Sequence, residues 1–310
     1  MKETFKGYLL CFLGVFTWSF SEIMVKLLQR SATPVGPISL SFLRFFFGGL
    51  FLFLIILLKK DTKDLFSFLR KQKNCILMLF SGMVALGISN IIYFVGLQST
   101  HANIGSAIYT TYTIFISIYS IFLLNERTNL PLKFIGYAIG FIGVSILITD
   151  FLNLIIDPAH LLGNLLLLLA AAIWAFHSVT GKILFLSLPE IKNVEIKFTT
   201  LAFFLACVPI SIALVFSPEI NTFFLYSFND WIIIMLLAII STGFGLFIFF
   251  VGIKKIEVSR GISMALLKPI IATVFAFLIL GEIPTIALLI SIPLIAIAIL
   301  LINRPIAKMK

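Results

Sequence analysis

The chain has 310 residues, of which 61% are hydrophobic and only 12% are charged. An ordinary soluble domain carries about 25% charged residues, so this composition excludes a soluble globular protein and indicates an integral membrane protein. The net charge of +10 does not indicate nucleic-acid binding, because the basic residues cluster in the short segments between apolar runs.

Ten apolar runs follow one another along the chain, each close to the roughly 20 residues that cross a bilayer core as a helix. Inside lipid only helices and closed barrels satisfy their backbone, and runs of this length are helices. The predicted fold is therefore an all-α integral membrane protein with ten transmembrane helices. The predicted spans cover residues 7–29, 36–58, 75–97, 102–124, 132–149, 161–182, 198–216, 231–253, 259–281 and 285–303.

The 23 lysines and arginines are unevenly distributed between the segments that join these spans. If the N-terminus lies inside, nearly all of them fall in cytoplasmic segments, whereas the opposite segments carry Arg30 alone. Because cytoplasmic loops carry the excess of Lys and Arg, this distribution predicts a multi-pass protein of the cytoplasmic membrane with both termini inside. The lipid bilayer is then an expected partner, and nucleic acid is not.

Two pairs of segments repeat along the chain. "WSFSEIMVK" (residues 18–26) and "WAFHSVTGK" (174–182) share the pattern W-x-F-x5-K. The segments 96–126 and 252–282 both begin with glycine and end with glutamate, and a further glycine lies at the same position in each. The sequence therefore predicts two related halves.

Each predicted half, 1–150 and 151–310, contains five spans. Because five is odd, the second half must enter the membrane upside down relative to the first, which makes the halves inverted repeats. Such repeats exchange conformations during alternating access, and their substrate site lies near the middle of the membrane between the halves.

The repeated W-x-F-x5-K, the arginine-containing "SFLRFFFGGL" of the second span, and "GISMALLKP" with "LILGE" in the ninth resemble the EamA-type ten-helix transporters of the drug/metabolite transporter superfamily. The resemblance covers residues 7–303. It implies a permease for small metabolites, commonly amino acids or related compounds and often exported. Thr113, where a proline is frequent, and Lys268, where an apolar or acidic residue is commoner, depart from the family pattern.

Glu22 lies in the first span, one turn from Trp18 and one turn from Lys26, so the three side chains share one stripe of the helix. An ionisable group at the bilayer centre costs about 2.5–3.5 kcal/mol, so it normally faces a cavity or a partner. Two interpretations stay open: a static ion pair with Lys26, or a carboxyl group that binds a proton or another coupling ion during transport. Lys26 and Lys182 themselves are expected to reach the headgroups.

Arg44 and Lys268 are further cations predicted at membrane depth. The planar guanidinium of Arg44 suits a substrate carboxylate, Glu22, or a structural counter-ion. Lys268 needs an anion nearby to stay charged, either a group of the substrate or a protein carboxylate; otherwise it is neutral. Pro269 removes a backbone donor and permits a kink beside it.

Aromatic and polar side chains complete the predicted substrate-binding site. Trp18 and Trp174 lie midway along their helices, away from the interfaces that tryptophan favours, and either line the cavity or pack between helices. His177 is a second candidate for proton coupling, or a packing residue. A polar band in the third and fourth spans is expected to face inward and contributes Asn90, Tyr93, Tyr109 and Tyr112.

These features favour a secondary transporter that exports an amino acid or related zwitterion, as a monomer or homodimer, coupled to a proton or another ion. A transporter of quaternary or aromatic cations is the alternative. A membrane enzyme acting on lipid-linked substrates is the remote alternative, because the sequence has no HExxH, P-loop or GxSxG motif. No cofactor or metal is expected, since the three cysteines have no CxxC spacing.

Overall fold

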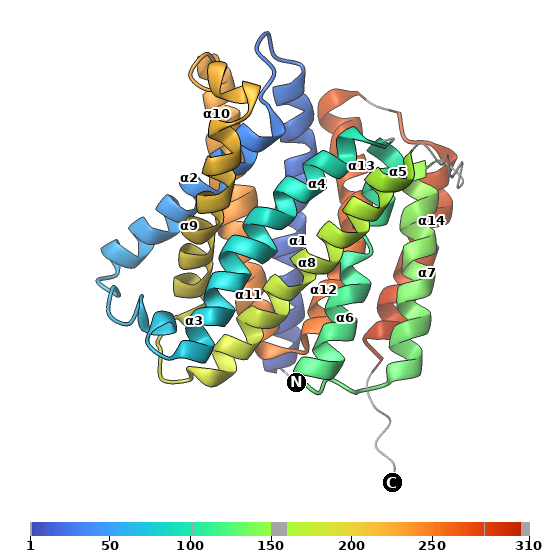
Figure 1. The fold of residues 1–310 in the computed structure, drawn as a ribbon. Coiled ribbons are helices and arrows are strands. Elements are labelled where there is room, and N and C mark those ends of the chain that lie inside the picture. The colour runs from blue at the N-terminus through green and yellow to red at the C-terminus, as the bar shows by residue number, and fades with distance from the viewer. Residues whose placement is uncertain (1, 101, 150–159, 282, 305–310) are drawn as a thin grey trace.

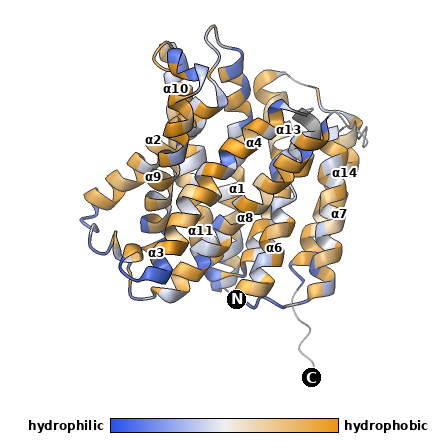
Figure 2. Ribbon diagram, in the orientation of Figure 1, coloured by the Kyte–Doolittle hydropathy of each residue, from blue (hydrophilic) through white to orange (hydrophobic). Residues whose placement is uncertain are grey.

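The computed structural model of the chain describes residues 2–100, 102–149, 160–281 and 283–304, and this part of the chain is helical throughout, without strands (Figure 1). The prediction of an all-α membrane protein is confirmed. Hydrophobic residues cover the length of the bundle, and hydrophilic ones gather mainly in the loops and near the helix ends (Figure 2).

The first five predicted spans are formed by seven α-helices and one π-helical segment. The segment joining the second and third spans contains a short 3₁₀ helix. The elements are α1 (Lys2–Gln29), α2 (Pro37–Leu58), η1 (Ser67–Leu69), α3 (Gln72–Leu79), η2 (Phe80–Ile88), α4 (Ser89–Gln98), α5 (Ala102–Tyr109), α6 (Tyr112–Leu123) and α7 (Leu130–Thr149).

The last five predicted spans follow the same plan. A short 3₁₀ helix again joins the second and third of them. The elements are α8 (Leu161–Ser187), α9 (Val194–Val215), η4 (Pro218–Asn221), α10 (Phe228–Leu236), η5 (Leu237–Phe244), α11 (Gly245–Lys255), α12 (Val258–Ser263), η6 (Met264–Leu267), α13 (Lys268–Leu280) and α14 (Ile286–Ile302).

Eight of the predicted spans are helices long and apolar enough to cross a membrane. The other two are shorter. The fourth is interrupted at Thr110 and Thr111, which separate α5 from α6, and the tenth is the 17-residue α14. Interruptions occur at matching places in the two halves, because η2 and η5 are both π-helical and η6 breaks the ninth span where Thr110 and Thr111 break the fourth.

The packing pairs also match between the halves. Helix α1 packs on α11 and α13, and its counterpart α8 packs on α4 and α6. Helices α2 and α9 pack on each other at one side of the bundle, and α7 and α14 do so at the other (Figure 1). Gly136, Gly140 and Gly143 form a packing face of α7: a Cβ on any of them would touch α14 or Leu266 of η6.

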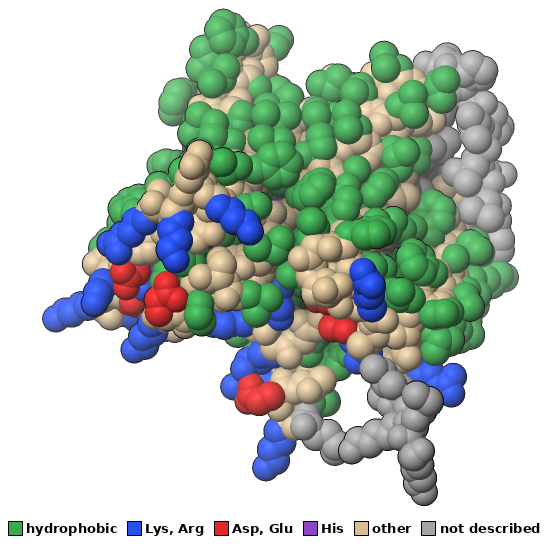
Figure 3. Space-filling view, turned by 60° about the horizontal axis from the view of Figure 1, so that its bottom comes forward, with side chains coloured by type: hydrophobic (Ala, Val, Ile, Leu, Met, Phe, Trp, Pro, Cys, Tyr) green, Lys and Arg blue, Asp and Glu red, His purple; other side chains and the backbone are tan. Residues whose placement is uncertain are grey.

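Lysines and arginines gather at one end of the bundle, which we call the basic end (Figure 3). Contacts tie the segments at this end together: Lys255 pairs with Glu3, Lys254 Nζ lies 2.7 Å from Glu195, Lys197 Nζ lies 2.8 Å from Asp61, and Asn129 donates to the carbonyl of Arg304 at 2.7 Å. The start of α1 and the end of α14 therefore lie at the same end.

Lys182 differs from its prediction. Its ammonium does not reach out to headgroups but donates to the backbone carbonyls of Ile253, Lys254 and Ile256, at 2.6, 2.9 and 3.2 Å. These carbonyls lie at the C-terminal end of α11, where helix carbonyls lack partners and a cation is favourable. Lys182 therefore ties α8 to α11.

Substituting Gly252 by valine is expected to destabilise the bundle. A Cβ at this position would lie 2.6 Å from Cys11 Sγ and 2.8 Å from the Cys11 backbone nitrogen, so α1 and α11 would have to separate. Overpacking of this kind costs about 1–3 kcal/mol. We expect the midpoint of thermal unfolding in detergent to fall by several degrees, and Leu300→Val on the exposed face of α14 to leave it unchanged. Equal midpoints for the two variants would contradict the close approach of these helices.

Candidate functional site

An ion pair joins the two halves of the chain within the membrane-spanning region. Lys268 Nζ lies 2.6 Å from Glu22 Oε1. The first part of the ninth span ends with η6, and the second part, α13, begins at Lys268. Pro269 lies in the first turn of α13, where the backbone N–H that proline lacks would have no partner within the helix. A helix N-terminus carries partial positive charge of the same sign as the lysine, so the Glu22 carboxylate stabilises both.

The ion pair borders open space rather than packed side chains. The Glu22 side chain is 51% exposed and that of Lys268 is 30% exposed. Glu22 lies seven residues before Gln29, about 10 Å along the helix from the end of α1 that is opposite the basic end. Both charges are thus accessible to a further charged or polar group.

Arg44 of α2 lies in the electrostatic neighbourhood of Glu22, Tyr93 and Tyr109. Its Nε is buried and has no hydrogen-bond partner, and its Cζ lies 4.9 Å from the centre of the Phe45 ring. Within the described part of the chain, no carboxylate lies at ion-pair distance from the guanidinium. The site therefore has two cations and one carboxylate, and Arg44 is the cation without an anion.

A row of aromatic rings runs beside these charges. The ring centres of Tyr93 and Tyr109 are 4.5 Å apart, those of Tyr109 and Tyr112 are 5.6 Å apart, and those of Tyr112 and Trp174 are 4.7 Å apart. The break at Thr110 and Thr111 places Tyr109 and Tyr112 on either side of it. Tyr93 and Tyr112 lie near enough to Glu22 and Lys268 for their charges to act on both phenols, so the row lies beside the ion pair.

Seven of the ten predicted site residues come together in this way. We call them the central site, which consists of Glu22, Arg44, Tyr93, Tyr109, Tyr112, Trp174 and Lys268. Its members come from both halves of the chain. The sequence spacing suggests Lys26 as the ion-pair partner of Glu22, whereas in the structure the partner is Lys268.

Trp18 is placed in helix packing. Its side chain is 9% exposed, its ring centre lies 4.9 Å from that of Phe249, and a Cβ on Gly245 would lie 2.8 Å from its Cδ1. The indole Nε1 has no hydrogen-bond partner. A role of Trp18 in substrate binding stays a prediction.

Asn90 and His177 are also buried outside the central site. Asn90 donates from Nδ2 to the carbonyl of Leu86 at 2.8 Å. His177 Nδ1 shares a 2.8 Å hydrogen bond with Ser81 Oγ, and the ring stacks on Phe198 at 5.3 Å. These contacts place His177 in packing between α8, η2 and α9, and proton coupling through it stays a prediction.

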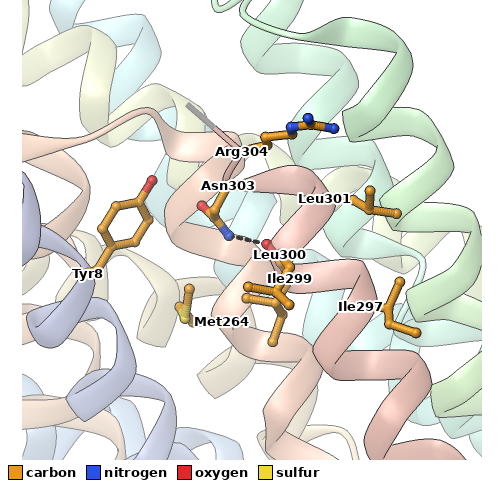
Figure 4. Close-up of a pocket in the computed structure, with 8 residues that line it drawn as sticks. All are labelled: Tyr8, Met264, Ile297, Ile299, Leu300, Leu301, Asn303 and Arg304. Carbon is orange, nitrogen blue, oxygen red and sulfur yellow. Dashed lines mark hydrogen bonds between the residues drawn. The ribbon is translucent and has the colours of Figure 1, made fainter. Parts of the chain in front are cut away.

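A separate groove of about 610 Å³ opens between Tyr8 of α1, Met264 of η6 and the last turns of α14 (Figure 4). Its lining is almost entirely apolar, with Asn303 and Arg304 at the end of α14. None of the central-site residues lines it. The central site and this groove are therefore different places in the bundle.

The ten-span architecture and the site between its halves define an integral membrane protein of transporter type. The model of the EamA-like transporter family matches the chain twice, over residues 5–149 and 161–304. The chain therefore belongs to the EamA-like transporter family.

Two relatives are similar to the chain over most of its length. An uncharacterized transporter of Clostridium kluyveri (strain ATCC 8527) is 25% identical over 290 residues, which cover 89% of this chain and 86% of the relative. The uncharacterized transporter YoaV of Bacillus subtilis (strain 168) is 26% identical over 283 residues, which cover 91% of each. A crystal structure with 19% identity matches with a TM-score of 0.78 over 96% of both chains, which shows the fold alone.

Proposed function

We propose that the chain is a secondary transporter that carries a small zwitterionic metabolite, such as an amino acid, through the cytoplasmic membrane by alternating access of two inverted halves. The observation that carries the proposal is the charge set of the central site: a Glu22–Lys268 pair that is open to a ligand, and Arg44 without an anion. The matched packing pairs and helix breaks of the two halves support the inverted arrangement.

A zwitterion complements this charge set at both of its ends. Its carboxylate neutralises Arg44, whose planar guanidinium suits bidentate carboxylate binding. Its ammonium competes with Lys268 for Glu22. Because Lys268 begins α13, loss of its partner would release the start of that helix. Substrate binding is thereby linked to movement of the ninth span, which alternating access requires.

A quaternary or aromatic cation fits the central site less well. The aromatic row from Tyr93 to Trp174 offers ring faces for such a cation. However, Glu22 is already paired with Lys268, and Arg44 adds a second positive charge without a partner. A cation would enter a site of net positive charge, so the zwitterion is favoured.

The orientation and the coupling belong to the same proposal. The basic end lies in the cytoplasm, since positively charged segments stay inside. Transport runs in the export direction. Glu22 is the carboxylate that couples transport to a proton, because a proton and the substrate ammonium both compete with Lys268 for the Glu22 carboxylate.

The proposal predicts that Arg44 determines ligand class. We expect Arg44→Gln to abolish binding of zwitterions and organic anions, and Arg44→Lys to weaken it by about tenfold, because a lysine keeps the charge but loses the bidentate geometry. The measurement is a thermal-shift screen of purified protein against amino acids, organic anions and organic cations, followed by transport in proteoliposomes. Arg70→Gln, an exposed cation of the basic end, is the matched control. Stabilisation by organic cations alone, unchanged in Arg44→Gln, would overturn the zwitterion proposal.

A further inference from the structure

A buried polar cluster at the basic end joins the first half of the chain to the ninth span. It consists of Glu126, Lys133, Glu257 and Ser259. Glu126 and Lys133 come from the α6–α7 loop and the first turn of α7, and Glu257 and Ser259 lie at the start of α12. None of these residues belongs to the central site, and the proposed function uses none of them.

Lys133 is the centre of the cluster. Its side chain is only 1% exposed, and its Nζ lies 2.9 Å from Glu257 Oε2, 2.9 Å from Ser259 Oγ and 3.3 Å from the carbonyl oxygen of Glu126. An ammonium group has three donors, and all three are used. A fully desolvated lysine is stable only with such complete pairing, so separation of its partners is costly.

Glu126 binds the other half of the chain from the same side. Its carboxylate accepts hydrogen bonds from the backbone N–H of Val258 at 2.7 Å, and from the N–H and the hydroxyl of Ser259 at 3.1 and 2.9 Å. Tyr137 of α7 donates to the carbonyl of Ser259 at 2.5 Å. The start of α12 is thus held on its backbone as well as on its side chains.

Glu257 accepts hydrogen bonds from the first half of the chain and also forms an ion pair within its own span. Besides Lys133, the hydroxyl of Thr128 in the α6–α7 loop donates to its carboxylate, and Arg260 Nε of α12 lies 2.9 Å from its Oε2. The Glu257 carboxylate is therefore in contact with Lys133 of the first half and with Arg260 of its own span. Removing its charge therefore weakens both of these contacts at once.

We infer that Glu126, Lys133, Glu257 and Ser259 form a latch that closes the basic end in this conformation and must come apart when α12 moves to open it. The inference rests on the proposed alternating access. Helix α12 continues through η6 into Lys268, so the latch and the Glu22–Lys268 pair hold the two parts of one broken span. Release of both is needed before that span can move as a whole.

The latch has only a partial equivalent in the sequence of the opposite end, where Glu282 matches Glu126. At the positions that match Glu257 and Lys133 in the other half, the sequence carries His101 and Leu289. The carboxylate–lysine pair is therefore specific to the basic end.

A native cysteine reports whether the latch is open. Cys11 of α1 is completely buried, and a Cβ on Gly261 of α12 would lie 3.1 Å from its sulfur, so α12 covers it directly. In a background with Cys75→Ser and Cys207→Ser, Cys11 is the single thiol of the chain. Its rate of labelling by a maleimide, measured without any substrate, follows the uncovering of this surface.

We expect Glu257→Gln to raise the labelling rate of Cys11 by about tenfold or more. The substitution weakens hydrogen bonds to a charged group that exist only in the closed conformation, so it destabilises that conformation relative to the open one. Glu257→Asp keeps the charge and is expected to label more slowly than Glu257→Gln. The matched control is Glu3→Gln, which removes another carboxylate that pairs with a lysine at the same end and should leave the rate at the wild-type value.

Two results would overturn the latch. One is equal labelling of Cys11 in Glu257→Gln, Glu3→Gln and the parent. The other is a parallel increase at Cys207 of α9, tested with Cys207 as the single thiol, since Cys207 is buried against Phe42 of α2 and its exposure would mean general loosening of the fold. Labelling of Cys11 requires no ligand, so the latch is tested independently of the substrate. If the Arg44 screen contradicts the zwitterion proposal, the labelling result is unaffected, and if labelling contradicts the latch, the Arg44 screen is unaffected.

Discussion

Replacing Lys268 by methionine is expected to cause a large loss of transport even though the residue is not the proposed ligand of the substrate carboxylate. The substitution leaves the Glu22 carboxylate without its partner at 2.6 Å, within the membrane-spanning region. A charge-assisted interaction of this kind is worth about 1.5–3 kcal/mol, so we expect transport to fall by roughly tenfold to a hundredfold. The measurement is uptake into proteoliposomes of the ligand found in the Arg44 screen.

The double variant Glu22→Gln, Lys268→Met separates stability from transport. It removes both charges, so the penalty of one uncompensated charge disappears, and the midpoint of thermal unfolding should return towards that of the wild type. Transport should stay lost, since no carboxylate remains for the substrate ammonium or the proton. If Lys268→Met transports at the wild-type rate, the ion pair is only structural and the proposed competition for Glu22 is wrong.

The sequence predicts the spans well, because the length and hydrophobicity of a membrane helix are fixed by the bilayer. Helix α8 runs five residues past its predicted end at 182, because apolar residues follow Lys182, and α9 begins four residues before its predicted start at 198, because Glu195 and Lys197 belong to its first turn. The π-helical segments and the interruption at Thr110 and Thr111 leave no mark in hydrophobicity. They depend on packing against neighbouring helices, which composition does not describe.

The central site was predictable to the extent that its residues are unusual within apolar spans. Glu22, Arg44 and Lys268 stand out because charge is costly there, and the structure brings them together. Their pairing was less predictable. Spacing along one helix indicates Lys26 as a partner of Glu22, whereas the 2.6 Å contact comes from a lysine on another span. One sequence without its fold does not determine which of two cations meets a carboxylate.

The latch was missed for a different physical reason. Lys133 lies at the predicted cytoplasmic edge of the fifth span, where lysine is normally solvated, yet its side chain is 1% exposed. The same holds for Lys197, which is equally buried. The one sequence feature that points to the latch is the repeated segment that ends at Glu126, because it has a glutamate at the same position after the fourth span as after the ninth. Its partners at the start of α12 are distant in sequence.

The Asp61–Lys197 pair at the basic end gives the largest expected effect on stability. Lys197 Nζ, almost fully buried, donates to Asp61 Oδ1 at 2.8 Å and to the carbonyl of Lys63 at 2.8 Å. We expect Asp61→Ala to leave the ammonium without its carboxylate and to cost about 3 kcal/mol, which lowers the midpoint of thermal unfolding by several degrees. Asp64→Ala, which removes a carboxylate that meets an exposed arginine at 3.9 Å, is the matched control and should change it little.

The same pair predicts how stability depends on pH. The hydrogen bond from Lys197, followed by that from Asn193, holds the pKa of the Asp61 carboxyl below its usual value. A group whose pKa is lower in the folded state stabilises the fold above its unfolded pKa of about 3.9, and this contribution is lost as the pH falls through the folded pKa. Between pH 5 and 8 the difference in unfolding midpoint between the parent and Asp61→Asn should therefore be constant, and it should shrink only below about pH 4. A difference that already disappears between pH 7 and 5 would mean that the carboxyl titrates in that range and that Lys197 does not hold it ionised.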